Sequence, residues 1–345
     1  ENQAVEYIFK SFGLKPPSWP IYGEEFSNPL FLTQYCRIHQ LNQKPLEFED
    51  FWTIITEYCS YVNDDLANKL DYDRNTNLVF SSLLKVAELM VSMGRWNLTY
   101  DTALQQITQE ASLTSKPQLF LSYLINEGLL RTEIVGGITY VEFEFERFGD
   151  YFIVFYLVNS NKLNAWLSKT LRLENYGEAL TILVPKLTGK EIYQVVPLQN
   201  QEEAFSNFIE YLPWRIDVTD DGIQKINEIV GNNLNAALYI SVSCVYKKQF
   251  SFNGNLLTKT LEAMSLSERD QKWTIGISEY ADELYTMLLN LSDWGQLLSA
   301  EMSQSLDEET VWLCCQGLVW ALSSTNKRLR DKSTHALVNL LEWKP

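Results

Sequence analysis

The stretch LLRTEIVGGITYVEFEF, residues 129–145, decides the fold expected for the middle of this chain. Residues 129–135 and 138–145 are two runs of strand-forming residues. Gly136-Gly137 between them accepts the positive φ angles of a tight turn, so the sequence predicts a β-hairpin. In the second run Val141, Phe143 and Phe145 alternate with Glu142, Glu144 and Glu146, which predicts one apolar face and one face with three carboxylates.

Three helices are expected before this hairpin and one after it. Residues 78–93 have apolar residues at helical spacing and end at Gly94, Thr99 caps a short helix, and residues 116–126 form another that Gly128 ends. The last two of these helices, the hairpin and the helix after it follow the order helix, helix, hairpin, helix, which is typical of a winged helix. We therefore predict a winged-helix domain over residues 76–160.

The charges of the hairpin favour a structural role for this domain. A wing that contacts DNA needs Lys or Arg to neutralise phosphates, whereas the second run carries three glutamates. A winged-helix DNA-binding regulator is therefore the least favoured interpretation.

Residues 1–75 are predicted to form a helical domain. The prolines of residues 15–20 exclude a helix there. A helix then begins cleanly, because Asn28 is a good N-cap residue and Pro29 suits the first helical position. A second amphipathic helix is expected at residues 51–66.

Residues 161–345 return to helices separated by short polar breaks. The clearest pair is 308–322 and 327–341, joined by the turn Ser323-Ser324-Thr325-Asn326. Such pairs cannot bury their apolar faces alone, so they stack. The expected fold class is mainly α: a helical domain, a winged helix with a small β-hairpin, and an α-solenoid of HEAT-like or TPR-like repeats.

Composition narrows the possible partners. The 345 residues contain 28 Lys plus Arg against 44 Asp plus Glu, a net charge of −16, which argues against binding nucleic acid or anionic lipid. The longest apolar run, residues 151–158, is too short to cross a bilayer, so no membrane association and a cytoplasmic location are expected. Because the chain starts at Glu1 rather than Met, we expect it to be a piece of a longer protein.

The residues do not predict a complete enzyme. Five cysteines without a CxxC pair are expected to be buried thiols, and His39 and His335 each stand alone, which disfavours a metal site. A phosphate-binding GxxxxGK[ST] loop is missing, as are the GxSxG and HExxH motifs.

Six motifs together resemble one family, the bacterial antiviral STAND NTPases (Avs), relatives of animal NLR and plant resistance proteins. The resemblance spans residues 20–342. The motifs are, in chain order, residues 25–32 (EFSNPLFL), 70–73 (LDYD), 143–151 (FEFERFGDY), 212–215 (LPWR), 267–273 (SERDQKW) and 327–338 (KRLRDKSTHALV).

The resemblance implies a defence sensor. Such proteins carry an N-terminal effector, often a nuclease, then an ATPase module, a winged helix and helical repeats that bind a phage protein such as a terminase or portal. Target binding opens the molecule, ATP with Mg stabilises the open form, and oligomerisation, commonly to a tetramer, activates the effector. This chain would be the central part, without the P-loop and the Walker B acid.

The same resemblance implies three nucleotide-binding candidates. The proline that matches Pro29, following Asn28, packs on the adenine in STAND proteins, although a helix start explains both residues without a ligand. Arg147 lies where the winged helix closes over the phosphates in related proteins. A structural ion pair of Arg147 with Glu146 or Asp150 is the alternative.

Other charged residues leave two interpretations open. Arg215, Arg269, Asp270, Arg330 and Asp331 can contact a partner, or form a ladder of Arg–Asp pairs that locks neighbouring repeats, which we favour. For the whole chain, the alternative to a STAND relay is a helical scaffold that binds a basic protein partner without nucleotide.

Overall fold

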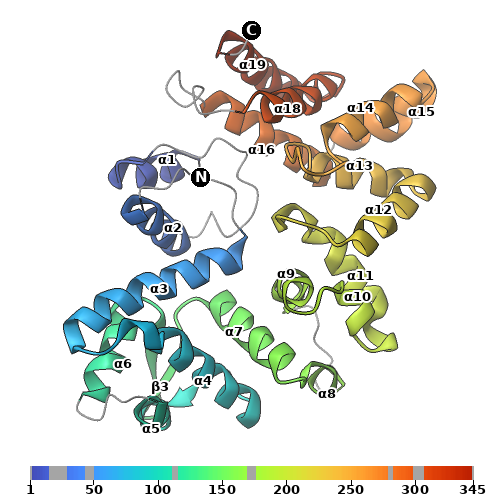
Figure 1. Ribbon diagram of the computed structural model, residues 1–345. Coiled ribbons are helices and arrows are strands. Elements are labelled where there is room, and N and C mark those ends of the chain that lie inside the picture. The colour runs from blue at the N-terminus through green and yellow to red at the C-terminus, as the bar shows by residue number, and fades with distance from the viewer. Residues whose placement is uncertain are drawn as a thin grey trace. The chain divides into compact units, whose positions relative to one another are not determined.

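The computed structural model describes residues 2–14, 29–42, 50–110, 116–168, 176–278, 283–297 and 307–343. These parts are mainly helical with one small three-stranded antiparallel sheet, in agreement with the coarse fold class expected (Figure 1). The chain divides into two compact units, Glu49–Trp214 and Glu1–Phe48 with Arg215–Pro345. We call them the sheet unit and the helical unit, and the three-domain division at residues 75 and 160 stays a prediction.

The sheet unit contains all three strands, with helices before and after them. Its elements are α3 (Phe51–Leu70), η2 (Arg74–Thr76), α4 (Leu78–Met93), β1 (Leu98–Thr99), α5 (Tyr100–Glu110), α6 (Pro117–Asn126), β2 (Leu130–Val135), β3 (Ile138–Phe143), α7 (Glu146–Asn159), α8 (Leu163–Leu167), α9 (Gly177–Thr188), α10 (Ile192–Val195), η4 (Leu198–Asn200), α11 (Gln201–Glu210) and η5 (Leu212–Trp214).

The hairpin predicted at residues 129–145 is confirmed. β2 pairs antiparallel with β3, from Leu130 opposite Phe143 to Val135 opposite Ile138. Gly136 and Gly137 have φ angles of 58° and 80°, as the tight turn requires. The short β1 pairs with the other edge of β3, so the strand order is β1-β3-β2.

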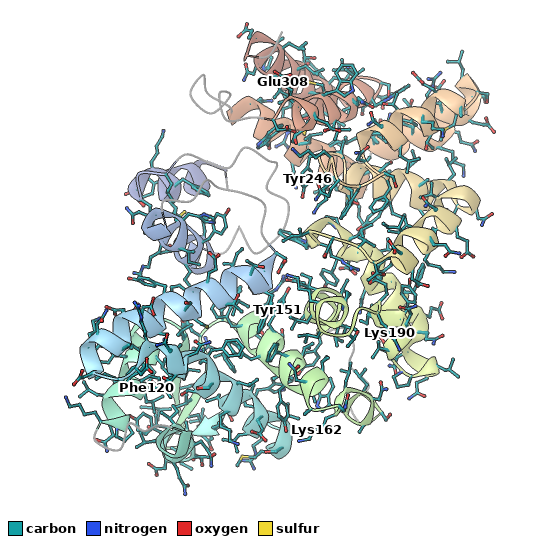
Figure 2. All side chains as sticks on the ribbon, viewed as in Figure 1. Phe120, Tyr151, Lys162, Lys190, Tyr246 and Glu308 are labelled. Atoms are coloured by element: carbon teal, nitrogen blue, oxygen red, sulfur yellow. The ribbon has the colours of Figure 1, made fainter. Side chains whose placement is uncertain are left out.

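Local sequence signals account for the helices around the sheet. Gly94, at φ 62°, ends α4, and the Thr99 hydroxyl accepts a hydrogen bond from the backbone N–H of Thr102 at the start of α5. Val141 and Phe143 point into the core, where Figure 2 also shows Phe120 of α6 in the same part of the unit. β3 ends at Phe143 and Glu146 begins α7, so of the three predicted carboxylates only Glu142 lies in the strand.

One helical stretch among the described residues, Arg74–Met93, is long and apolar enough to span a bilayer. It includes α4, which packs against α3, α5 and α7, and Val79, Leu83 and Val86 are completely buried in these contacts. We therefore interpret α4 as a core helix of the sheet unit, since a core helix meets the same criteria of length and composition.

The described elements of the helical unit are all helical. They are α1 (Asn2–Ser11), α2 (Pro29–Asn42), α12 (Asp220–Asn232), α13 (Leu234–Ser243), α14 (Gly254–Ala263), α15 (Leu266–Arg269), the π-helical η6 (Asp270–Thr274), η7 (Gly276–Ser278), α16 (Glu283–Leu297), α18 (Glu308–Ala321) and α19 (Lys327–Trp343).

The pair α18 and α19 confirms the two helices expected near the C-terminus. Both pack against α16, and the contact of α16 with α19 is especially close (Figure 1). A Cβ added at Gly295 of α16 would lie only 2.7 Å from the Cβ of Ala336 in α19. Small residues at this crossing therefore let the two helices approach closely.

Candidate functional site

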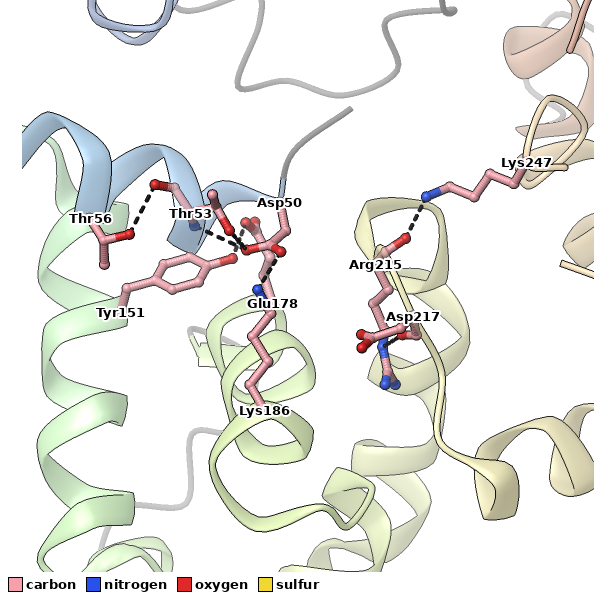
Figure 3. A network of polar contacts seen from close by, with 9 residues as sticks. All are labelled: Asp50, Thr53, Thr56, Tyr151, Glu178, Lys186, Arg215, Asp217 and Lys247. Carbon is pink, nitrogen blue, oxygen red and sulfur yellow. Dashed lines mark hydrogen bonds and ion pairs between the residues drawn. The ribbon is translucent and has the colours of Figure 1, made fainter. Parts of the chain in front are cut away.

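Helix α9 carries a charged network into the core of the sheet unit. A Glu178 carboxylate oxygen accepts a hydrogen bond from Nη1 of Arg147 at 2.5 Å, and its other oxygen accepts one from the Tyr151 hydroxyl at 2.8 Å. Glu178 is 8% exposed and Tyr151 is 1% exposed. Because Arg147 and Tyr151 both belong to α7, the network joins α7 to α9, and Figure 3 shows its Tyr151–Glu178 contact.

A second ion pair joins α9 to α3. The ammonium of Lys186, one residue after Pro185 in α9, donates to the buried carboxylate of Asp50. Asp50 is also the N-cap of α3, because it accepts from the backbone N–H of Thr53 at 3.1 Å. The Asp50 carboxylate thus accepts a hydrogen bond from the first turn of α3 and also forms the ion pair with Lys186 of α9 (Figure 3).

The charges of the Glu178 network stabilise the charged form of Arg147. Burial alone lowers the pKa of Arg147, but the adjacent Glu178 carboxylate outweighs burial and raises that pKa. Burial and the Glu178 charge raise the pKa of Tyr151 well above its ordinary value, so Tyr151 stays a hydrogen-bond donor. Arg147 and Glu178 therefore form a stable, partly buried salt bridge.

Aromatic rings pack around this network from α3 and α7. Phe51 stacks on Tyr151 with ring centroids 5.0 Å apart, and Trp52 stacks on Phe155 at the same distance. Phe51, the first residue of α3, is 3% exposed. The rings exclude water from the polar contacts and raise the cost of breaking them.

The structure corrects the expected partner of Arg147. A structural ion pair is present, as the alternative interpretation required, but the acid is Glu178 of α9 and not the sequence neighbours Glu146 or Asp150. Within the described residues, neither the Glu146 nor the Asp150 side chain makes a hydrogen bond or an ion pair. Burial and the charges of Glu146 and Glu178 raise the pKa of Asp150 to about 8, so this carboxyl holds a proton at neutral pH.

The other two candidate nucleotide contacts are only partly described. Pro29 is the first residue of α2, as expected for a proline at a helix start, and Asn28 lies outside the described residues. Helix α2 packs against α1, where the ring of Tyr35 contacts Phe9 at a centroid distance of 6.3 Å. Pro29 and Arg147 belong to different compact units.

The expected ladder of Arg–Asp pairs is wrong for two of its arginines. The Arg330 guanidinium donates to the Ser324 carbonyl oxygen at 2.7 Å, and Arg269 lies over the Trp320 ring at 5.4 Å. Neither makes an ion pair with an acid in the described parts of the chain. Arg269 thus joins α15 to α18 through an aromatic face, whereas Arg330 binds the turn that precedes its own helix α19.

A buried lysine occurs in the helical unit, which sequence reasoning missed. Lys247 is 2% exposed, and its ammonium donates to the Arg215 carbonyl oxygen at 2.6 Å. The Arg215 guanidinium in turn donates to the Asp217 carbonyl oxygen at 3.0 Å, so both cations bind backbone in a segment before α12 (Figure 3). Rings of Tyr246 and Phe250 lie 5.7 and 5.2 Å from the ammonium.

Glu178 and Lys186 were also missed, although a signal for them exists. They are the two charged residues in the otherwise apolar α9 sequence GEALTILVPKLT, and a charge in a buried helix needs a partner. The partner of Glu178, Arg147, lies 31 residues away along the chain, and the partner of Lys186, Asp50, lies 136 residues away. No local pattern reveals such distant pairs.

The thiols are buried, as predicted for all five cysteines. Burial raises the pKa of Cys36 to about 12 and those of Cys244 and Cys315 to about 11, so these thiols stay protonated and unreactive at neutral pH. Within the described ranges, no group of three or more His, Cys, Asp or Glu side chains is arranged to hold a metal ion.

The comparisons with known proteins give no relative that would assign this site. No protein-family model matches the chain. Neither a curated protein nor a solved structure is similar to it. The function therefore has to be argued from the geometry above.

Proposed function

We propose that this chain is the central relay segment of an antiviral STAND NTPase. In this proposal the parent protein senses a phage protein, of the terminase or portal type, and couples ATP binding and oligomerisation to an N-terminal effector such as a nuclease. The segment itself supplies no Walker A or Walker B residue. Its task is to transmit a conformational change between the target-binding repeats and the nucleotide module.

The observation that carries the proposal is the module formed by α4, β1, α5, α6, β2 and β3. Its element order and its strand order β1-β3-β2 fit a winged helix, the domain that follows the nucleotide module in STAND proteins. The hairpin favours a structural role over DNA reading, because Arg131 of β2 is neutralised by Glu142 of β3 at 2.7 Å. Its tip exposes Ile134, Val135 and Ile138 instead of cations.

The two ion pairs of α9 are suited to a relay. Lys186–Asp50 connects α9 to α3 before the module, and Arg147–Glu178 connects it to α7 after the hairpin. Separating a partly buried ion pair costs free energy, because each charge is left without its partner in a poorly solvated place. Such pairs therefore stabilise one arrangement of the helices over others. In the proposal they hold the resting arrangement, and opening exchanges their partners.

Two nucleotide contacts are proposed. Pro29, the first residue of α2, and Asn28, which precedes it in the sequence, would pack on the adenine of ATP or ADP. The Arg147 guanidinium, held by Glu178 in the structure, would contact phosphates when it exchanges partners. The P-loop and the Mg-binding acids are proposed to lie in another part of the parent protein.

The helices of residues 161–345 are proposed to stack as the first repeats of an α-solenoid. The packing of α18 and α19 against α16 supports this interpretation, since each pair buries its apolar face on its neighbour. Repeats of this kind would bind the phage protein. Activation would produce a homo-oligomer, possibly a tetramer, in the cytoplasm.

The test uses the full-length protein from its own gene in a bacterial host challenged with phage. The upstream sequence must encode a P-loop lysine followed by an acidic Walker B strand, and native mass spectrometry of the purified protein must show bound ADP or ATP. Glu178→Gln is expected to weaken the resting state and cause oligomerisation without phage, whereas Glu228→Gln, in the exposed Lys225–Glu228 pair of α12, is the matched control.

Three outcomes would overturn the proposal: no P-loop upstream, no bound nucleotide, or no change in protection from phage when the P-loop lysine is replaced. Pro29→Ala with full activity would remove the adenine contact alone. Absence of nucleotide together with binding of a basic protein would favour the rival function, a helical scaffold. Retention of duplex DNA at low salt would favour a winged-helix regulator.

A further inference from the structure

Strand β2 forms a long, exposed edge of the small sheet. It is outermost in the strand order β1-β3-β2, and five of its six residues, 131–135, are exposed to solvent. The opposite edge is formed by β1, which is only two residues long. An edge strand carries backbone N–H and C=O groups that can pair with another strand. The sheet can therefore be extended at β2.

The hydrogen bonds of the hairpin determine which backbone groups of β2 are free. The backbone N–H of Glu144 donates to the Leu129 carbonyl oxygen at 3.2 Å, so these two residues form a hydrogen-bonded pair. Bonded and non-bonded pairs alternate along an antiparallel ladder, so every second residue after Leu129 also bonds β3. The residues between them direct their backbone groups to the free edge: Leu130, Thr132 and Ile134. Within the residues that the structure describes, these outward groups have no hydrogen-bond partner.

The edge lacks the usual protection against strand pairing. Natural edge strands are commonly blunted by a β-bulge, a proline or a lysine. β2, with the sequence LRTEIV, contains neither proline nor lysine, and its register with β3 runs from Leu130 to Val135 without a bulge. Its end also exposes apolar side chains, since Ile134 is 73% exposed and Val135 is 51% exposed. Such an edge is open to a further strand.

The charges of β2 fit a second copy of the same strand. In an antiparallel pair centred on Thr132, Arg131 of each copy lies opposite Glu133 of the other, which gives two complementary pairs. A pair centred on Glu133 would place two glutamates opposite each other, and a pair centred on Arg131 would place two arginines there, so both are disfavoured by repulsion. The charges therefore select one register.

The backbone agrees with this register. Outward-directed residues can form hydrogen-bonded pairs only with other outward-directed residues. Centring on Thr132 pairs Thr132 with its copy and Leu130 with Ile134 of the other strand. All three outward-directed residues of each strand then find partners.

We propose that β2 pairs antiparallel with β2 of a second copy of this chain, around a two-fold axis at Thr132. Ile134, exposed in the single chain, then lies beside Leu130 of the second copy, which is completely buried in its own core. The same patch is used on both copies, and the other edge of each sheet is the short β1. Association therefore closes as a dimer.

The ion pair within the hairpin leaves room for this contact. Arg131 binds Glu142 of β3 at 2.7 Å, yet its side chain remains 54% exposed. In the described parts of the chain, the Glu133 side chain makes no hydrogen bond or ion pair. In the dimer each Arg131 lies between Glu142 of its own chain and Glu133 of the second copy, so one guanidinium serves two carboxylates.

The pairing needs neither nucleotide nor a phage protein, so it does not rest on the proposed STAND function. One strand pair buries little area, which predicts a dissociation constant of roughly 10–100 μM. Sedimentation of the purified chain at concentrations that span this range measures it. Added salt should weaken the dimer, because exposed charges form part of the contact.

Thr132→Pro separates strand pairing from folding. Proline is tolerated on an edge strand where its missing N–H would face outward, as at Thr132, but it removes hydrogen bonds at the centre of the dimer. We expect the variant to keep the circular dichroism spectrum of the unaltered chain and to raise the dissociation constant at least tenfold. Thr132→Ala keeps the backbone donor and is the matched control, which should dimerise normally.

An exchange of charges tests the register. Glu133→Arg makes both positions positive, and Arg131→Glu together with Glu142→Arg makes both negative while it keeps an ion pair within the hairpin. Each variant alone should dimerise at least tenfold more weakly than the unaltered chain. A mixture of the two should form a heterodimer at least as tight as the original dimer, because both cross-strand pairs become complementary.

Three results would overturn the proposal. The first is a chain that stays monomeric throughout the concentration range, which would leave β2 as an edge for a different protein. The second is a Thr132→Pro variant that dimerises as the unaltered chain does, which would place the interface elsewhere. The third is a mixture of charge variants that associates no better than each variant alone. None of these results bears on nucleotide binding, so they are distinct from a failure of the proposed function.

Discussion

The two compact units hold their helices together in different ways. In the sheet unit, buried or partly buried ion pairs connect helices far apart in the chain, as Lys186 does with Asp50 over 136 residues. In the helical unit neutral contacts also join the helices: Ser292 bonds Ser333 at 2.8 Å, and the indole N–H of Trp273 donates to the Trp320 carbonyl at 3.1 Å. Its ion pairs Lys332–Asp293 and Lys248–Asp307 have carboxylates that are about a quarter and about half exposed, whereas Asp50 and Glu178 of the sheet unit are almost fully buried.

This difference predicts what each unit responds to. Neutral packing responds to changes of volume, because interiors are as dense as crystals and have no room for an added methyl group. Ion pairs respond to pH, to salt and to the loss of one partner. A relay that changes state needs the second kind of contact, and the deeply buried carboxylates of Asp50 and Glu178 give the sheet unit such contacts.

The largest effect is expected for Gly254→Val in the helical unit. A Cβ at Gly254 would lie 2.6 Å from the carbonyl oxygen of Leu313, so α14 and α18 would have to separate. We expect the free energy of unfolding to fall by about 3 kcal/mol. Urea denaturation followed by tryptophan fluorescence measures this change.

Gly231→Ala in α12 is the matched control for that substitution. No atom lies within 4 Å of a Cβ placed there, and alanine favours a helix over glycine by about 0.5–1 kcal/mol. The control is expected to be neutral or stabilising. Equal losses from both substitutions would contradict the view that close packing holds the helical unit.

The next largest effect is expected for Glu178→Ala in the sheet unit. It leaves the Arg147 guanidinium, two-thirds buried, without its carboxylate and the Tyr151 hydroxyl without an acceptor. The expected loss is about 2 kcal/mol in urea denaturation. Arg147→Met together with Glu178→Leu should recover most of it, and a double variant as unstable as the sum of both single variants would refute the pairing.

A pH dependence is expected from Asp150. Its pKa is raised from 3.8 to about 8 in the folded chain. Between these values the folded state holds a proton that the unfolded state has released, so the stabilisation is complete below about pH 4 and is lost as the pH rises through 8, with a slope of at most about 1.4 kcal/mol per pH unit.

The difference between the original chain and Asp150→Asn isolates this contribution. Some acids have a lowered pKa, such as Glu88 beside Lys85 and Asp307, which accepts a backbone hydrogen bond from Thr310; they stabilise the fold less as the pH falls. Both proteins contain these acids, so their contributions cancel in the difference. Identical pH profiles of stability for the two proteins would show that the Asp150 carboxyl is solvated.

The smallest effect is expected in the hairpin turn. Gly137 has a φ of 80°, which costs a β-branched residue about 1–2 kcal/mol, although no atom blocks a Cβ there. Gly137→Val should therefore lower thermal stability slightly, and Gly137→Asn should lower it less. A large loss from both variants would mean that the turn makes contacts beyond its backbone conformation.

Local signals in the sequence predicted the elements well. The alternation of residues 138–145 and the glycine pair predicted the hairpin, and Gly94 and Thr99 predicted a helix end and a helix start, because caps and turns depend on a few adjacent residues. The arginine partners were predicted less well. Arg147 was expected to pair with a neighbour, since sequence shows only short-range charges, and the structure pairs it with Glu178.

The sequence by itself determined where helices, turns and the hairpin form, that the thiols are buried, and that the second strand of the hairpin carries an acid rather than a cation. Only the tertiary structure decided which charges meet: Glu178 with Arg147, Asp50 with Lys186, and Asp150 with none. The physical reason is range. Propensities and caps act within a few residues, whereas the cost of burying a charge is met by whichever opposite charge the packing of the whole unit brings within hydrogen-bond distance.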